Sequence, residues 1–124
     1  MLVVNYNGNK PISNYFKYSV NGNNNIDVVR FVVLKNQGYI DLSTSDKVSV
    51  KYANYDNDFV DEEEIASENV NVADNTLFVD WHLSSELTKQ ESLEVSLCFQ
   101  RNSDVWQTQI FKLKIMNGII IEGE

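Results

Sequence analysis

Residues 93–99 read LEVSLCF and place Leu93, Val95, Leu97 and Phe99 at alternate positions. Successive side chains of a β-strand point to opposite faces, so this alternation predicts a strand with one dry face and one wet face. Two other stretches repeat the pattern, with apolar side chains at Val48, Val50 and Tyr52 and at Leu77, Val79 and Trp81. Such strands cover their dry faces when one sheet packs on another. We therefore expect an all-β fold, an immunoglobulin-like antiparallel β-sandwich.

The whole chain, residues 1–124, is expected to form a single domain, because this length can bury a core without metals or disulfides. The predicted inward side chains share one phase along their strands: Phe16, Phe31, Val50, Val79, Trp81, Val95, Leu97 and Phe99. Val28–Leu34 is apolar on both faces except at Arg30. An unpaired buried guanidinium is costly, so Arg30 should have a partner or reach an edge.

The segment from Trp106 to Ile115 changes phase. Trp106, Thr108 and Ile110 share one face, whereas Phe111, Leu113 and Ile115 share the other. This shift predicts one long strand with a bulge near Ile110, which crosses from one sheet to the other.

Three further segments are expected to lie between the main strands. Asp41–Ser45 and Ser84–Gln90 are expected to be short turns, each able to hold one helical turn. The acidic run Asp56–Glu64 is expected to form a hairpin tip and a charged edge strand. Charge on an edge strand discourages aggregation between sheets.

The chain is acidic, with a formal net charge of −8 and a sequence pI of about 4.5. Such a surface repels phosphate backbones and anionic lipids, so we expect neither nucleic acid nor membrane as a partner. No apolar run approaches the length that crosses a bilayer. The segment Met1–Tyr6 lacks the features of a signal peptide, which indicates synthesis in a reducing cytoplasm.

Few residues could carry chemistry. Cys98 is the only cysteine and His82 the only histidine. We interpret Cys98 as a small hydrophobe packed on the second face of its strand and His82 as a half-exposed strand residue. A small hydrolase that uses His82 with Cys98 is the alternative.

The acidic run resembles the start of a calcium loop at Asp56 and Asp58, but Val60 follows and the required glycine is missing. No glycine-rich phosphate loop, zinc-ligand spacing or serine elbow occurs in the chain. We therefore expect no enzyme, no catalytic residue, no metal and no cofactor.

Aromatic residues outside the core phase indicate a recognition surface. They are Trp106, Phe78, Tyr15, Tyr39 and Tyr55, which fall out of phase with the core or in turns. Exposed aromatics recognise sugars or proteins, although each of these residues could instead pack within the domain. A carbohydrate-binding module with Trp106 and nearby tyrosines as stacking platforms is therefore one functional hypothesis.

Short motifs follow one another in a recognisable order between Asn21 and Thr108. They are Gly22-Asn23-Asn24 before Ile26-Asp27-Val28-Val29-Arg30-Phe31, then Tyr39-Ile40-Asp41-Leu42-Ser43, Val50-Lys51-Tyr52, Asp80-Trp81-His82-Leu83 with Thr88 behind it, Leu97-Cys98-Phe99, and Val105-Trp106-Gln107-Thr108. In these motifs the chain resembles short virion proteins of phages and prophages of Gram-positive bacteria, and is similar to the amino-terminal domain of baseplate upper proteins. The resemblance implies a β-sandwich that docks onto a tail, baseplate or head assembly, without catalytic residues. It also implies that the Asp-Leu-Ser segment caps the second long strand and that the two Trp segments plug the ends of the sandwich.

The expected function is that of a phage or prophage structural protein located in the virion and made in the host bacterial cytoplasm. No fibre, collagen-like or lectin module follows Ile121, which favours an adaptor or decoration subunit that contacts other virion proteins. The alternative is a carbohydrate-binding module that recognises host cell-surface glycans.

Virion proteins work in symmetric assemblies, so we expect a homo-oligomer. One candidate contact is the second face of Val28–Leu34 and of Trp106–Ile110; the other is a strand edge at Leu2–Tyr6 or Ile119–Ile121. The candidate interface residues are Val3, Val4, Trp106, Ile110, Ile119, Ile120 and Ile121. We favour the termini, with a core role as the alternative, and expect deletion of residues 119–124 to lower the assembly state without loss of cooperative unfolding.

Overall fold

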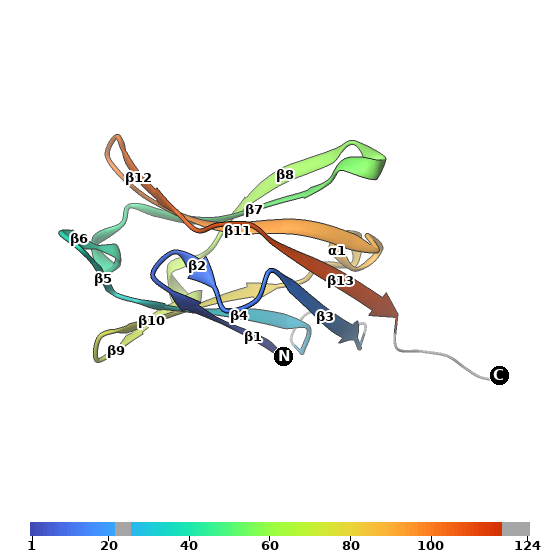
Figure 1. The fold of residues 1–124 in the computed structure, drawn as a ribbon, viewed down its shortest axis with the longest axis horizontal. Helices are drawn as coiled ribbons and strands as arrows, with labels where there is room; N and C mark the ends of the chain where they lie inside the picture. The colour runs from blue at the N-terminus through green and yellow to red at the C-terminus, as the bar shows by residue number, and fades with distance from the viewer. Residues whose placement is uncertain (22–25, 118–124) are drawn as a thin grey trace.

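The computed structural model describes residues 1–21 and 26–117, and it contains two β-sheets packed face to face over an apolar core (Figure 1). The five-stranded sheet has the spatial order β2 (Lys10–Pro11), β1 (Leu2–Asn7), β4 (Val28–Leu34), β10 (Thr76–His82) and β9 (Val70–Ala73). The six-stranded sheet has the order β3 (Tyr15–Val20), β13 (Phe111–Asn117), β11 (Ser92–Arg101), β7 (Lys47–Asn54) and β8 (Phe59–Glu64), and β12 (Asp104–Gln107) also pairs with β11.

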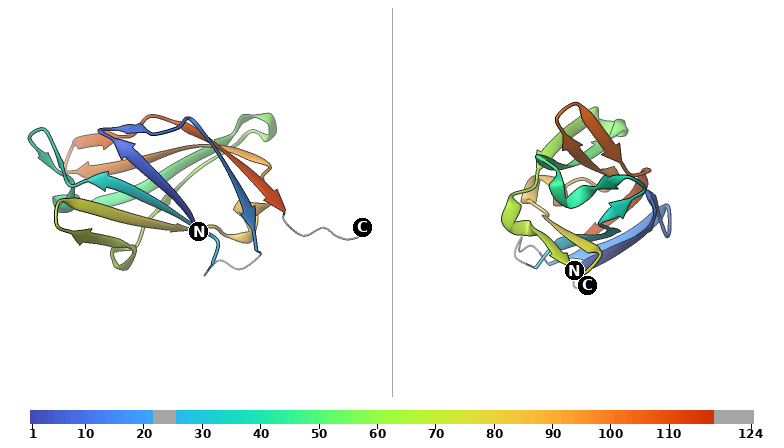
Figure 2. Two further views of the ribbon diagram at one scale, coloured as in Figure 1. Left: turned by 60° about the horizontal axis from the view of Figure 1, so that its bottom comes forward. Right: turned by 90° about the vertical axis from the view of Figure 1, so that its left-hand side faces the viewer.

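Short elements connect these strands. A two-stranded hairpin of β5 (Asn36–Gln37) and β6 (Ile40–Asp41) projects from one end of the sandwich, beside the β11–β12 hairpin (Figure 2). The helical segments are the 3₁₀ turns η1 (Leu42–Thr44), η2 (Tyr55–Asn57) and η3 (Ser67–Asn69) and the single α-helical turn α1 (Ser85–Thr88).

The predicted all-β sandwich is confirmed, and its core lies where the alternation placed it. Seven of the eight predicted inward side chains are buried. The exception is Phe16, which is only partly buried because β3 is an edge strand. Its ring contacts Phe111 edge-on, with the centroids 5.2 Å apart.

The prediction of purely antiparallel pairing is wrong at two places. β1 runs parallel to β4, with Val4 opposite Phe31, and β3 runs parallel to β13, with Phe16 opposite Leu113. Alternation specifies which face of a strand is buried, but it carries no information about the direction of the neighbouring strand. The immunoglobulin-like connectivity therefore stays a prediction.

The predicted long bulged strand near Ile110 is also wrong, although its change of phase is real. β12 and β13 are separate strands, and both pair with β11 in the same sheet rather than crossing between sheets. Between them Thr108 is buried: its backbone N–H donates to Leu97 O at 2.9 Å, and its Oγ1 accepts from Leu97 N–H at 2.8 Å. These bonds divert the chain, so that Ile110 is exposed while Phe111 enters the core.

The two predicted helical turns are confirmed, and each has a side-chain cap. The Asp41 carboxylate accepts from Ser43 N–H at 3.0 Å at the start of η1, and Ser84 Oγ accepts from Leu87 N–H at 3.3 Å at the start of α1. Each turn buries one leucine, Leu42 or Leu87. The acidic run forms the predicted tip and edge strand, η2 and β8.

Candidate functional site

The two candidate interface residues on β1 lie on opposite faces of the strand. Val4 is completely buried opposite Phe31, so its assignment to a partner interface is wrong. Val3 is 44% exposed on the outer face of the five-stranded sheet. β1 is not an isolated edge, because β4 pairs with it from Leu2 to Asn5 and β2 covers its far end. Val4 points inward from β1 because its side chain fills part of the core between the two sheets.

The carboxy-terminal candidates Ile119, Ile120 and Ile121 lie outside the described residues. Gly22, Asn23 and Asn24 of the first motif also lie outside them. The role of Ile119–Ile121 in assembly stays a prediction.

A paired guanidinium occupies the middle of the outer face of the five-stranded sheet. Arg30 Nε and Nη2 donate to the two carboxylate oxygens of Asp80 at 2.7 and 2.9 Å, which confirms the predicted partner. The Arg30 guanidinium also lies over the ring of Phe78, 5.6 Å from its centroid. The hydrogen bonds to Asp80 raise the pKa of Arg30, so the guanidinium stays charged at neutral pH.

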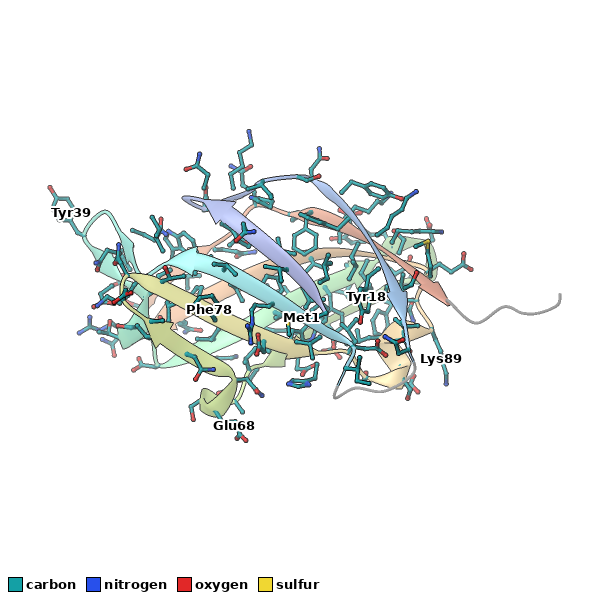
Figure 3. The ribbon with its side chains drawn as sticks, turned by 90° about the horizontal axis from the view of Figure 1, so that it is seen from below. Met1, Tyr18, Tyr39, Glu68, Phe78 and Lys89 are labelled. Carbon is teal, nitrogen blue, oxygen red and sulfur yellow. The ribbon has the colours of Figure 1, made fainter. Side chains whose placement is uncertain are left out.

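Apolar side chains surround this ion pair. Val3, Val32, Leu34 and Phe78 all point outward from the five-stranded sheet, and we call them the outer apolar face. Leu34 is 49% exposed, and Val32 and Phe78 are partly exposed. Figure 3 shows Phe78 on this face, and no strand or helix among the described residues packs over it.

Trp106 lies at one end of the sandwich, in the wall of a cavity of about 400 Å³ that we call the end cavity. The β5–β6 hairpin and η1 form one wall, and the β11–β12 hairpin forms the other. The lining comprises Tyr39, Ile40, Asp41, Leu42, Thr44, Ser45, Phe99, Arg101, Asp104, Val105 and Trp106. Trp106 is half-buried and contacts Phe99 edge-on, with the centroids 5.8 Å apart. Tyr39 is fully exposed at the tip of its hairpin (Figure 3).

Hydrogen bonds join the two walls of the end cavity. Arg101 Nη1 donates to Thr44 Oγ1 at 3.1 Å. Asp46 accepts from Asn102 N–H at 2.9 Å through its carboxylate, and its own N–H donates to Gln100 O at 2.8 Å. Hydrogen bonds from Ser43, aided by nearby cations, hold the pKa of Asp41 below its usual value. The cavity therefore carries an ionised carboxylate at neutral pH.

Ile110 lies away from Trp106, so the predicted common face of these two residues is wrong. Ile110 is 53% exposed and borders a shallow depression of about 430 Å³ on the outer face of the six-stranded sheet, which Tyr55 and Val60 also line. The break between β12 and β13 separates the two residues. Sequence spacing alone could not locate that break.

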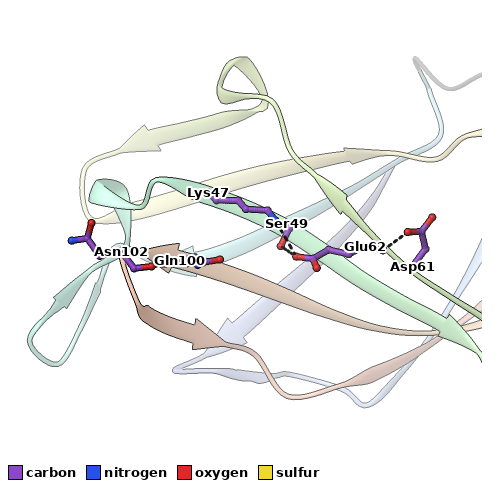
Figure 4. Close-up of polar contacts among 6 residues, drawn as sticks. All are labelled: Lys47, Ser49, Asp61, Glu62, Gln100 and Asn102. Atoms are coloured by element: carbon purple, nitrogen blue, oxygen red, sulfur yellow. Dashed lines mark hydrogen bonds and ion pairs between the residues drawn. The ribbon is translucent and has the colours of Figure 1, made fainter.

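The acidic edge strand is held to its neighbour β7 by a hydrogen bond and an ion pair (Figure 4). Ser49 Oγ donates to Glu62 Oε2 at 2.5 Å, and Lys47 Nζ lies 3.8 Å from the same oxygen. The Ser49 hydrogen bond and nearby lysines lower the pKa of Glu62. Trp81 Nε1 donates to Glu63 at 3.3 Å, which ties the edge to the core. These carboxylates therefore have structural partners.

The structure does not bring His82 and Cys98 together. His82 alternates with the buried Trp81 and faces outward from the five-stranded sheet. Cys98 alternates with the buried Leu97 and Phe99 on the six-stranded sheet, where it is buried on the opposite side of the sandwich, as predicted for a packed cysteine. A nucleophile and its base must lie within hydrogen-bond reach, so these two residues do not form a catalytic pair.

Residues 1–21 and 26–117 contain no group of three or more His, Cys, Asp or Glu side chains that could hold a metal ion. No helix within these residues is long and apolar enough to cross a membrane.

No protein-family model, curated protein or solved structure matches this chain. Within residues 1–21 and 26–117, the fold is a β-sandwich whose candidate contact surfaces include the outer apolar face and the end cavity. The sequence pointed to the second face of Val28–Leu34, on which Val32 and Leu34 lie, and to the out-of-phase residues Phe78, Tyr39 and Trp106. It did not identify Arg101 as a neighbour of Tyr39 and Trp106.

Proposed function

We propose that this chain is a structural protein of a phage or prophage particle. It serves as an adaptor or decoration subunit of the tail, baseplate or head and acts by protein–protein contact. The outer apolar face is the observation that carries the contact part of the proposal, because contiguous exposed apolar surface is typical of protein interaction sites. The motifs between Asn21 and Thr108 and their resemblance to virion proteins support the assignment to a particle.

The chemistry of the outer apolar face suits burial against a protein. Arg30 and Asp80 already satisfy each other through two hydrogen bonds, so a partner covers a paired charge and not an isolated one. Arginine and aromatic side chains are enriched at the centres of protein interfaces. The apolar residues Val3, Val32 and Leu34 surround that centre.

Mass spectrometry of purified particles tests the assignment. Prophage is induced in the bacterium that encodes the chain, and particles are isolated on a density gradient. We expect the chain to sediment with tail, baseplate or head proteins in a fixed ratio. Its confinement to the soluble fraction would contradict the proposal.

A matched pair of variants tests the contact surface. Leu34→Lys places a charge on the outer apolar face, whereas Val60→Lys places the same charge on an exposed residue of β8 in the other sheet. We expect Leu34→Lys to reduce incorporation into particles at least about tenfold while its melting temperature stays near that of the wild type. Equal incorporation of the two variants would exclude this face.

A further inference from the structure

The end cavity has the dimensions of a site for a small ligand. Its volume of about 400 Å³ falls within the usual range for such sites, about 300–1,000 Å³. Four of its lining residues come from segments separated by more than half the chain, namely Tyr39 and Ile40 on one hairpin and Val105 and Trp106 on the other. The hydrogen bonds from Arg101 to Thr44 and from Asn102 to Asp46 hold the β11–β12 hairpin against η1 and the residues that directly follow it. When a site is already formed, less binding free energy is lost to the ordering of its walls.

The aromatic residues of the end cavity are more exposed than folding requires. Tyr39 is fully exposed, so its ring adds no packing to the core. Trp106 is half-buried against Phe99 and still lines the cavity. Both side chains combine an apolar ring with a polar hydrogen-bonding group. A sugar ring is complementary to them, because it has an apolar C–H face and hydroxyl groups around its rim.

Polar groups beside the rings suit hydroxyl ligands. Asp41 and Asp104 offer carboxylate oxygens as acceptors. Arg101 offers donors, since a guanidinium has five N–H groups and the bond to Thr44 uses one nitrogen. With two carboxylates against one guanidinium in the lining, and a formal net charge of −8 on the chain, the cavity disfavours anions.

From these features we infer that the end cavity is a binding site for a neutral saccharide, with Tyr39 and Trp106 against the sugar ring and Asp41, Arg101 and Asp104 bonded to its hydroxyls. The site lies on different elements from the outer apolar face, and this inference does not depend on the proposed virion role. A particle protein can carry both surfaces, and either can fail without the other.

Titration of the full chain with neutral saccharides tests the inference. The probes are oligosaccharides of glucose, galactose, N-acetylglucosamine and rhamnose, each followed by amide chemical shifts in NMR. We expect saturable shifts at Tyr39–Ile40 and Arg101–Trp106 with at least one probe, with a dissociation constant on the order of 1 mM. An oligomer of glycerol phosphate serves as the anionic probe and is expected not to bind.

Paired tyrosine variants distinguish a specific binding site from non-specific binding. Tyr39→Ala is expected to weaken binding at least about tenfold, whereas Tyr55→Ala is expected to bind as the wild type does. Tyr55 is the matched control because it is also exposed and belongs to η2, not to the cavity. Trp106→Phe should retain more binding than Trp106→Ala, whose folding is checked by its melting temperature. The absence of saturable shifts with every neutral probe, unchanged binding by Tyr39→Ala, or preferential binding of glycerol phosphate would overturn the inference.

Discussion

Phe31 is the residue at which the two sheets meet. Its ring centroid lies 6.3 Å from that of Trp81 on β10 and 6.2 Å from that of Phe111 on β13, in the opposite sheet. Tyr6 on β1 adds a third ring at 6.4 Å. Phe31 is completely buried, so removal of its ring leaves a void that neighbours from both sheets cannot fill.

Phe31→Ala should therefore lower the free energy of unfolding by about 3–5 kcal/mol, the usual cost of deleting a buried phenylalanine ring. Urea denaturation followed by tryptophan fluorescence measures this loss. Tyr39→Ala is the control and should change stability by less than about 0.5 kcal/mol, because its ring is exposed. A loss near zero for Phe31→Ala would contradict the observed burial.

The raised pKa of Tyr52 predicts that the protein loses stability at alkaline pH. Burial, with Asp61 and Glu63 nearby, raises the pKa of Tyr52 from 10.0 to about 12. A folded-state pKa above the unfolded value means that the stabilisation is fully present below pH 10 and is lost as the pH rises to about 12. Thermal unfolding midpoints between pH 8 and pH 12 should fall above pH 10. Tyr52→Phe should make this fall shallower but not abolish it, because the pKa values of Tyr6 and Tyr18 are also raised. An identical slope in Tyr52→Phe would exclude the assignment.

At the scale of the element, β1 combines a core face and a candidate contact face in adjacent residues. Val4→Lys places an amine in the fully buried position opposite Phe31, and should lower the free energy of unfolding by about 3 kcal/mol or more. Val3→Lys places the same group on the outer apolar face and should cost less than about 1 kcal/mol. Chemical denaturation of the two variants measures the difference. Similar losses would mean that the burial of β1 is misassigned.

Elements with a strong local signal could be predicted from the sequence. Alternation located β7, β10 and β11, and polar residues before an apolar one located the capped turns η1 and α1. Arg30 was expected to be paired because an isolated charge on a central strand is costly, and Asp80 is its partner. In each case the information lies within a few residues of the feature.

Elements set by long-range contacts could not be predicted. The parallel pairing of β1 with β4 depends on the route of the chain between them, which alternation does not encode. The end cavity has the same origin. Tyr39 and Trp106 were each identified as unlikely core residues by their phase, but only the packing of two distant hairpins makes them parts of one lining. No local sequence pattern specifies that these two residues lie beside the same cavity.

At the scale of the whole molecule, the surfaces differ in how they respond to another copy. β8 is an edge strand with carboxylates from Asp61 to Glu64, and charge on an edge opposes extension of the sheet by a second chain. The outer apolar face has a neutralised ion pair at its centre and apolar residues around it. With a formal net charge of −8, any two copies repel each other at long range.

Self-association should therefore increase with salt if the outer apolar face is the contact. The Debye length falls from about 30 Å at 10 mM to about 8 Å at 150 mM ionic strength, which screens the repulsion between acidic chains but leaves an apolar contact intact. Sedimentation velocity at the two ionic strengths should show a larger assembled fraction at 150 mM. Leu34→Lys should remain monomeric in both, whereas Val60→Lys should behave as the wild type does. Dissociation on addition of salt would instead point to an interface of opposite charges, for which the outer apolar face is the wrong surface.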